Sequence, residues 1–117
     1  MRAKLKSLHS PDVDLDRPNF KDPKDVFCLV QAEIGSENSK GADIFGFIVC
    51  TPLGLAGEME NKPIISGHGL LIVNEFNIQE IESYISSLCN QTTGKNWDEI
   101  ARKLGLIGQW EFEDYRG

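Results

Sequence analysis

The sequence predicts a single α+β domain over residues 1–117, in which an antiparallel sheet of four to five strands packs one face against two C-terminal helices. Three observations support this fold class. Stretches that alternate apolar and polar residues come early in the chain, stretches with a helical apolar period come later, and short polar connections join neighbouring strands. A chain of 117 residues forms one ordinary core, so no second domain is expected.

Three strands are expected in the first half of the chain. Residues 2–8 alternate small or apolar side chains with Arg and Lys, which is typical of a half-solvated edge strand. Residues 26–34 alternate in the same way and become more polar toward their end, while residues 42–51 are apolar on both faces in their middle. The polar turn at residues 35–41 is short, so these last two strands should form a hairpin.

Two longer stretches, residues 9–25 and residues 52–68, are expected to be irregular because they are rich in proline, glycine or charged residues. In the first of them, Phe20 is the expected anchor to the core. A short buried strand at residues 70–74 follows the second. No helix is predicted within residues 26–51, which argues against a parallel β-α-β order for the early strands.

Two helices are expected in the second half of the chain, at residues 78–90 and 97–104. Each follows an asparagine suited to an N-cap, Asn77 or Asn96, with a glutamate three residues later. Apolar residues then recur every three to four positions, so each helix has one face to bury. Tyr84 lies beside the apolar stripe of the first helix.

The chain ends in another alternating stretch, residues 109–113, which predicts a short last strand of the sheet. Successive side chains of a strand point to opposite faces. Trp110 and Phe112 should therefore face the core, and Glu111 and Glu113 should lie in solvent.

The net charge is −6, and all of it comes from the later part of the chain. Residues 1–40 hold seven basic and seven acidic residues, whereas residues 41–117 hold five basic and eleven acidic ones. Such a chain would be repelled by nucleic acid and acidic membranes and attracted to a basic partner, although ordinary solubility also explains moderate acidity. The longest apolar run, residues 44–50, is too short to span a bilayer, and no secretory signal is visible, so a cytoplasmic location is expected.

Few residues suggest chemistry of their own. The three cysteines lack a C-x-x-C pair, so they predict neither a disulfide framework nor a zinc site. Cys50 and His68 are a nucleophile and a base at strand ends, but no motif orients them. Asp12, Asp14 and Asp16 have the spacing that opens a calcium-binding loop, yet the glycine and the closing glutamate of such a loop are missing. We therefore expect no catalytic residue, no metal and no cofactor.

Three segments carry a family resemblance: MRAKLKSLHSPD at residues 1–12, FIVCTP at residues 47–52 and GQWEFEDY at residues 108–115. Together with LIV at residues 71–73 and WDEI at residues 97–100, they occur in an order and spacing that cover nearly the whole chain. On these segments the chain resembles immunity protein family 8 of bacterial polymorphic toxin systems.

The resemblance implies a small cytosolic antidote that binds and neutralises a toxin domain encoded by a neighbouring gene, without a cofactor and without catalysis. One departure from the family pattern follows the Thr-Pro pair. The family usually continues with a tryptophan there, whereas this chain has Leu53 and a longer loop that reaches Gly67. A nuclease toxin is the expected partner, because its basic phosphate-binding cleft would attract an acidic inhibitor.

Acidic residues of the later part are the candidates for toxin contact: Glu58, Glu60, Asp98, Glu111, Glu113 and Asp114. The free protein is expected to be a monomer or weak dimer that binds neither nucleic acid nor membranes. Two other functions remain open on the sequence alone. An intracellular adaptor or structural interaction module without a toxin partner would form a constitutive oligomer through a large apolar patch. A small enzyme that uses Cys50 and His68 would react with a thiol probe while folded.

Overall fold

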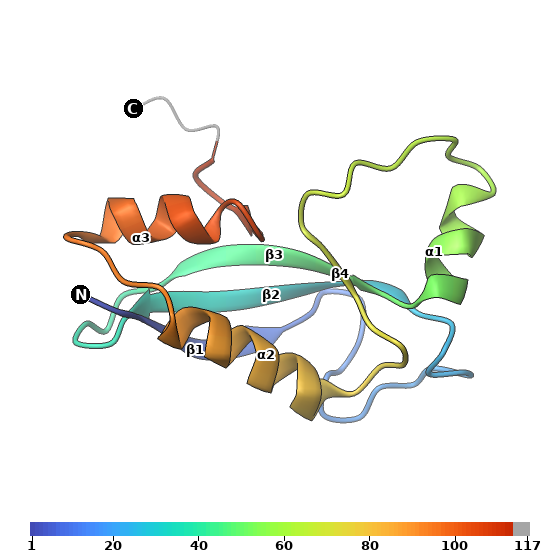
Figure 1. Cartoon of the computed structure of the whole chain (residues 1–117). Coiled ribbons are helices and arrows are strands. Elements are labelled where there is room, and N and C mark those ends of the chain that lie inside the picture. Colours follow the sequence, from blue (N-terminus) through green and yellow to red (C-terminus); the bar gives the residue numbers. More distant parts are fainter. Residues whose placement is uncertain (114–117) are drawn as a thin grey trace.

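The computed structural model describes residues 1–113 and has the predicted α+β architecture (Figure 1). In this part of the chain five strands form one sheet, accompanied by three helices. In chain order the elements are β1 (Ala3–His9), β2 (Phe27–Ser36), β3 (Asp43–Cys50), α1 (Pro52–Met59), β4 (Leu70–Ile72), α2 (Ile78–Asn90), α3 (Trp97–Leu104) and β5 (Gln109–Trp110). Strands and helices segregate along the chain as predicted, except around α1.

The sheet has the strand order β1-β2-β3-β4, and β5 pairs with another part of β3. The β1–β2 and β2–β3 pairs are antiparallel, as predicted. The β3–β4 pair is parallel, with Ile48 opposite Leu70 and Cys50 opposite Ile72. The sheet is therefore mixed, and the prediction of antiparallel pairing is wrong for this one pair. Parallel neighbours need a crossover of a dozen or more residues, and the connection through α1 supplies it.

Helix α1 occupies part of a stretch predicted to be irregular. Thr51 caps it, because its Oγ1 accepts a hydrogen bond from the backbone N–H of Gly54 at 3.1 Å, and Pro52 stands at the first helical position. Its two glycines disfavour a helix, so the sequence pattern does not predict one here. Packing requires a glycine at Gly54, since a Cβ there would lie 2.0 Å from the carbonyl oxygen of Val26. The missing side chain lets α1 start directly against the beginning of β2.

The core lies between one face of the sheet and helices α2 and α3, and both helices contribute to the same apolar cluster. Phe45 and Phe47 of β3 are its largest sheet residues. The buried residues of the two helices are Ile81, Ile85, Cys89, Ile100, Ala101 and Leu104. The predicted caps are confirmed, because Asn77 and Asn96 accept hydrogen bonds from the backbone N–H groups three residues later at 3.2 and 2.9 Å.

The loop before β2 is irregular, as predicted, and it is tied to the strand at one point. Ser10 Oγ donates to the carbonyl oxygen of Leu29 at 2.5 Å, and Asp12 Oδ2 accepts from the N–H of Leu29 at 2.8 Å. Further along the loop, the rings of Phe20 and Phe76 are 4.9 Å apart, which confirms Phe20 as an anchor. The loop therefore extends the bonding of β2 beyond the end of β1.

The predicted last strand is shorter than expected. β5 contains two residues, and a turn follows it in which the N–H of Glu113 donates to the carbonyl oxygen of Trp110 at 3.0 Å. Trp110 is half-buried against the core, but Phe112 is 40 % exposed, so the prediction that both aromatic residues lie in the core is wrong for Phe112. The turn ends the alternation on which that prediction depended.

Candidate functional site

The structure separates Cys50 from His68. Cys50 is completely buried, and burial raises the pKa of its thiol above the ordinary value. In the sheet it pairs with Ile72, whereas His68 stands in the turn before β4, in which the N–H of Leu70 donates to the carbonyl oxygen of Gly67 at 3.1 Å. The imidazole Nε2 of His68 instead lies 2.7 Å from the carbonyl oxygen of Gly105. These two residues therefore form no nucleophile and base pair.

The aspartates of the first loop are engaged with the backbone. Asp14 Oδ1 accepts hydrogen bonds from the N–H groups of Asp16 and Arg17 at 3.0 and 3.3 Å, and Asp12 bonds to β2. Within residues 1–113 no group of three or more His, Cys, Asp or Glu side chains is placed to hold a metal ion. The loop carboxylates thus shape the loop.

The predicted toxin contacts lie in two distant parts of the molecule. Glu58 and Glu60 are on α1 and at its end, whereas Asp98 is on α3, at the other end of the sheet (Figure 1). Glu58 forms an ion pair with Lys62 at 2.7 Å, and Asp98 forms one with Arg102 at 2.8 Å. Both carboxylates therefore already have a partner in the chain.

Two further candidates follow β5 and also have partners. Glu111 Oε2 accepts a hydrogen bond from the N–H of Ile44 at 2.6 Å, and Glu113 Oε1 lies 3.8 Å from His68 Nε2. Asp114 lies outside the described residues. The acidic residues proposed from the sequence thus do not converge on one surface.

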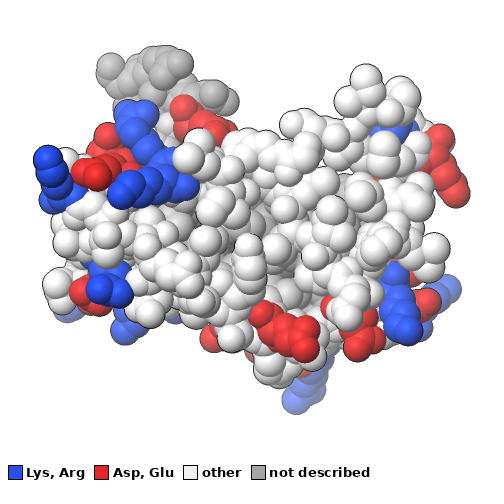
Figure 2. Space-filling view, in the orientation of Figure 1, with Lys and Arg blue, Asp and Glu red and all other residues white. Residues whose placement is uncertain are grey.

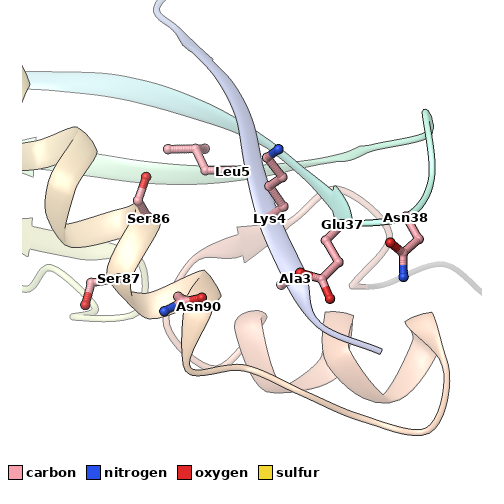
Figure 3. A pocket seen from close by; sticks show the side chains of 8 residues that line it. All are labelled: Ala3, Lys4, Leu5, Glu37, Asn38, Ser86, Ser87 and Asn90. Carbon is pink, nitrogen blue, oxygen red and sulfur yellow. The ribbon is translucent and has the colours of Figure 1, made fainter.

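One hollow lies between the outer edge of β1 and α2 and has a volume of about 700 Å³. Figure 3 shows its mostly polar lining, which comes from β1, α2 and the turn after β2. The lining residues are Ala3, Lys4, Leu5, Glu37, Asn38, Ser86, Ser87 and Asn90. The strand beside it carries Lys4 and Lys6 and a register shift between Leu5 and Ser7, features that discourage pairing with a further strand.

A second hollow, of about 470 Å³, lies at the start of β3 beside Asp43 and Trp97. Asp43 Oδ2 accepts hydrogen bonds from the indole N–H groups of Trp97 at 2.8 Å and Trp110 at 3.0 Å. One carboxylate oxygen therefore joins β3, α3 and β5. This arrangement has a structural explanation, because both indole donors find their acceptor there.

A third hollow lies between β4 and α2, with a volume of about 330 Å³. We call it the β4–α2 groove. It is lined by Leu71, Ile72, Val73, Glu75, Asn77, Glu80, Ile81 and Tyr84. Ile72 is 57 % exposed and Tyr84 is 52 % exposed, and Glu75 and Glu80 are the charged residues of the lining. Two large exposed side chains and two carboxylates therefore occur together here, and no Lys or Arg lines the groove.

The sequence interpretation missed the β4–α2 groove. It used Glu80 as a residue of the helix start and Tyr84 as a neighbour of the apolar stripe. The spacing of these two residues was the available signal, because positions four apart share one helix face. Ile72 of β4 and Glu75 of the following turn line the same groove because the fold places β4 beside α2.

Charged side chains are unevenly distributed on the face that Figure 2 shows. They gather at its margins, including acidic groups over the beginning of α2, and leave a broad uncharged area in the middle. Among residues 1–113 no helix has the length and apolar character needed to cross a bilayer.

A comparison with models of known protein families gives a match. The family model described as immunity protein 8 matches residues 3–115, which is nearly the whole chain. No curated protein and no solved structure matches the chain.

Proposed function

The chain belongs to the immunity protein 8 family, and from this we propose that it neutralises a toxin domain encoded by a neighbouring gene by forming a stoichiometric complex with it in the cytoplasm. The family match over residues 3–115 carries this proposal. The role of such a family is to protect against a toxin, so the partner is a protein domain.

A nuclease is the toxin class that the charge of the chain favours. The net charge is −6, and nucleases bind phosphates through basic surfaces. An acidic inhibitor is drawn to such a surface by long-range attraction, which speeds association. The inhibitor can then cover the cleft that substrate would enter.

Inhibition by binding fits the chemistry of the described residues. Burial raises the pKa of the Cys28 and Cys89 thiols to about 11, and Cys50 is fully buried, so none of the three presents a reactive thiolate. Neutralisation then depends on affinity. An antidote must outcompete substrate in the cell, and a nanomolar dissociation constant corresponds to about −12 kcal/mol.

Co-expression tests the proposal. The toxin domain alone should stop growth, this protein should restore growth, and titration calorimetry on the purified pair should show a one-to-one complex of nanomolar affinity or better. A nuclease activity of the toxin domain should disappear at equimolar inhibitor. Protection without a detectable complex would contradict the binding mechanism. A constitutive oligomer with no effect on the toxin would instead favour the adaptor function.

A further inference from the structure

We infer that the β4–α2 groove is the surface on which the toxin domain docks, and that it receives a Lys or Arg side chain of the toxin together with adjoining apolar residues. The inference rests on the proposed function, and it adds a location and a chemistry of recognition. Contacts, exposure, charge and backbone geometry support it separately.

The groove offers an apolar anchor. Ile72 and Tyr84 are 57 and 52 % exposed and both line the same hollow, although their neighbours Leu71 and Ile81 pack into the core. Tyrosine is enriched among the residues that dominate binding energies at protein interfaces. It contributes a large rigid surface and loses little conformational entropy when it is covered.

The carboxylates of the groove are free to meet a partner. Glu75 and Glu80 are exposed, and in the described part of the chain neither carboxylate forms an ion pair or a side-chain hydrogen bond. Glu58 and Asp98, in contrast, are paired with Lys62 and Arg102. No Lys or Arg lines the groove, so its negative potential is not cancelled locally.

The backbone of β4 also has unused bonding capacity. On the β3 side, the carbonyl oxygen of Gly69 accepts from Ile48, and the N–H of Val73 donates to Cys50, each at 2.8 Å. Residues of a parallel strand alternate in the direction of their backbone groups, so those of Ile72 point away from β3. No strand within residues 1–113 pairs with that outer edge.

A Lys or Arg side chain matches the apolar and the acidic side chains of the groove. Its aliphatic part can cover Ile72 and Tyr84, and its charged group can reach the carboxylates of Glu75 and Glu80. The Tyr84 ring adds a cation–π contact. Partner segments with acidic side chains would meet repulsion at the same place, which excludes them as occupants.

Kinetics of binding to the cognate toxin domain, at two salt concentrations, test this inference. The double variant Glu75→Lys/Glu80→Lys should associate about tenfold more slowly than wild type and lose most of the salt dependence of its association rate. Tyr84→Ala should dissociate about tenfold faster with little change in association. Thermal melts should show that both variants fold as wild type.

The matched control is Asp16→Lys/Glu37→Lys, which changes the net charge by the same amount at exposed positions outside the groove. It should bind nearly as wild type. An equal slowing in the control, or wild-type kinetics in both groove variants, overturns the groove as the docking surface. Wild-type protein that neither binds nor protects overturns the proposed function itself, so the two failures are distinguishable.

Discussion

The two faces of the sheet are built from the same strands and differ in what covers them. On the face beneath α2 and α3, Val30 and Phe47 lie opposite each other and are almost completely buried. On the other face, their neighbours Leu29 and Ile48 form an equally apolar pair that is partly exposed and does not join the core cluster of the described residues. Apolar character therefore does not decide which face of the sheet is buried. The position of the helices decides it.

Because of this difference, the two faces should contribute unequally to the stability of the fold. Burial of apolar area supplies most of the favourable free energy of folding, so the covered face should dominate the free energy of unfolding. One end of the other face is an exception. Cys50 points to that side and is nevertheless completely buried at the end of β3, where α1 follows.

The largest effect is expected from Phe47→Ala on the covered face. Phe47 is 2 % exposed, and its ring lies so close to Gly108 that a Cβ there would come within 2.7 Å of it. Removing the ring leaves a cavity that the strands cannot close, which costs about 3 to 5 kcal/mol of the free energy of unfolding. Urea unfolding measures this loss.

Thiol labelling gives a second measure of the same variant. All three cysteines are buried, so they should react with a thiol reagent only when the chain opens. Phe47→Ala should label much faster than wild type, whereas Phe47→Leu should label at a similar rate. A Phe47→Ala protein with wild-type stability would show that the covered face does not hold the core together.

Neighbouring residues of β3 provide a direct comparison of the two faces. Val49 is completely buried on the covered face, and Ile48 is partly exposed on the other. Val49→Ala should cost about 2 kcal/mol, and Ile48→Ala should cost about 1 kcal/mol although it removes more carbon atoms. Equal losses in denaturant unfolding would mean that the second face is covered as well.

A smaller effect is expected at Asp43, which links β3 to α3 and β5. Asp43→Ala removes the acceptor shared by the indole groups of Trp97 and Trp110, which should cost about 1 to 2 kcal/mol. Tryptophan fluorescence should shift toward longer wavelength as α3 and β5 loosen. Asp43→Asn keeps an acceptor oxygen and should lose less. Unchanged fluorescence and stability in Asp43→Ala would show that these hydrogen bonds do not hold α3 and β5 to β3.

The smallest effects are expected at the chain end beyond β5. Glu111→Lys removes the acceptor of the Ile44 N–H group and should cost about 1 kcal/mol. Glu113→Lys loses only a long, exposed contact to His68 and should leave stability unchanged. Thermal melts of the two variants distinguish them, and identical curves would show that the Glu111 bond contributes nothing.

The sequence-based predictions succeeded where local rules are sufficient. Helices α2 and α3 begin at the predicted caps, because an asparagine oxygen bonds to an amide only three residues away. The early hairpin follows from a short turn and alternating strands. Helix α1 was missed because glycine usually disfavours a helix. Gly54 is needed because the backbone of Val26, which is distant in the sequence, leaves no room for a side chain.

The candidate site was less predictable than the fold. Net charge drew attention to acidic residues, but Glu58, Asp98 and Glu111 have partners in the chain that only the folded structure reveals. The groove of Glu80 and Tyr84 depends on how β4 lies beside α2. A composition count contains no information about which carboxylates remain unpaired.

The sequence by itself determined the α+β class, the order of most elements, the caps of two helices and the acidic character of the chain, because each depends on composition or on residues a few positions apart. Only the tertiary structure decided that β4 runs parallel to β3, that α1 packs through Gly54, and that Ile72, Glu75, Glu80 and Tyr84 share one groove. These features join residues far apart in the chain, and their energies come from contacts that exist only after the chain has folded.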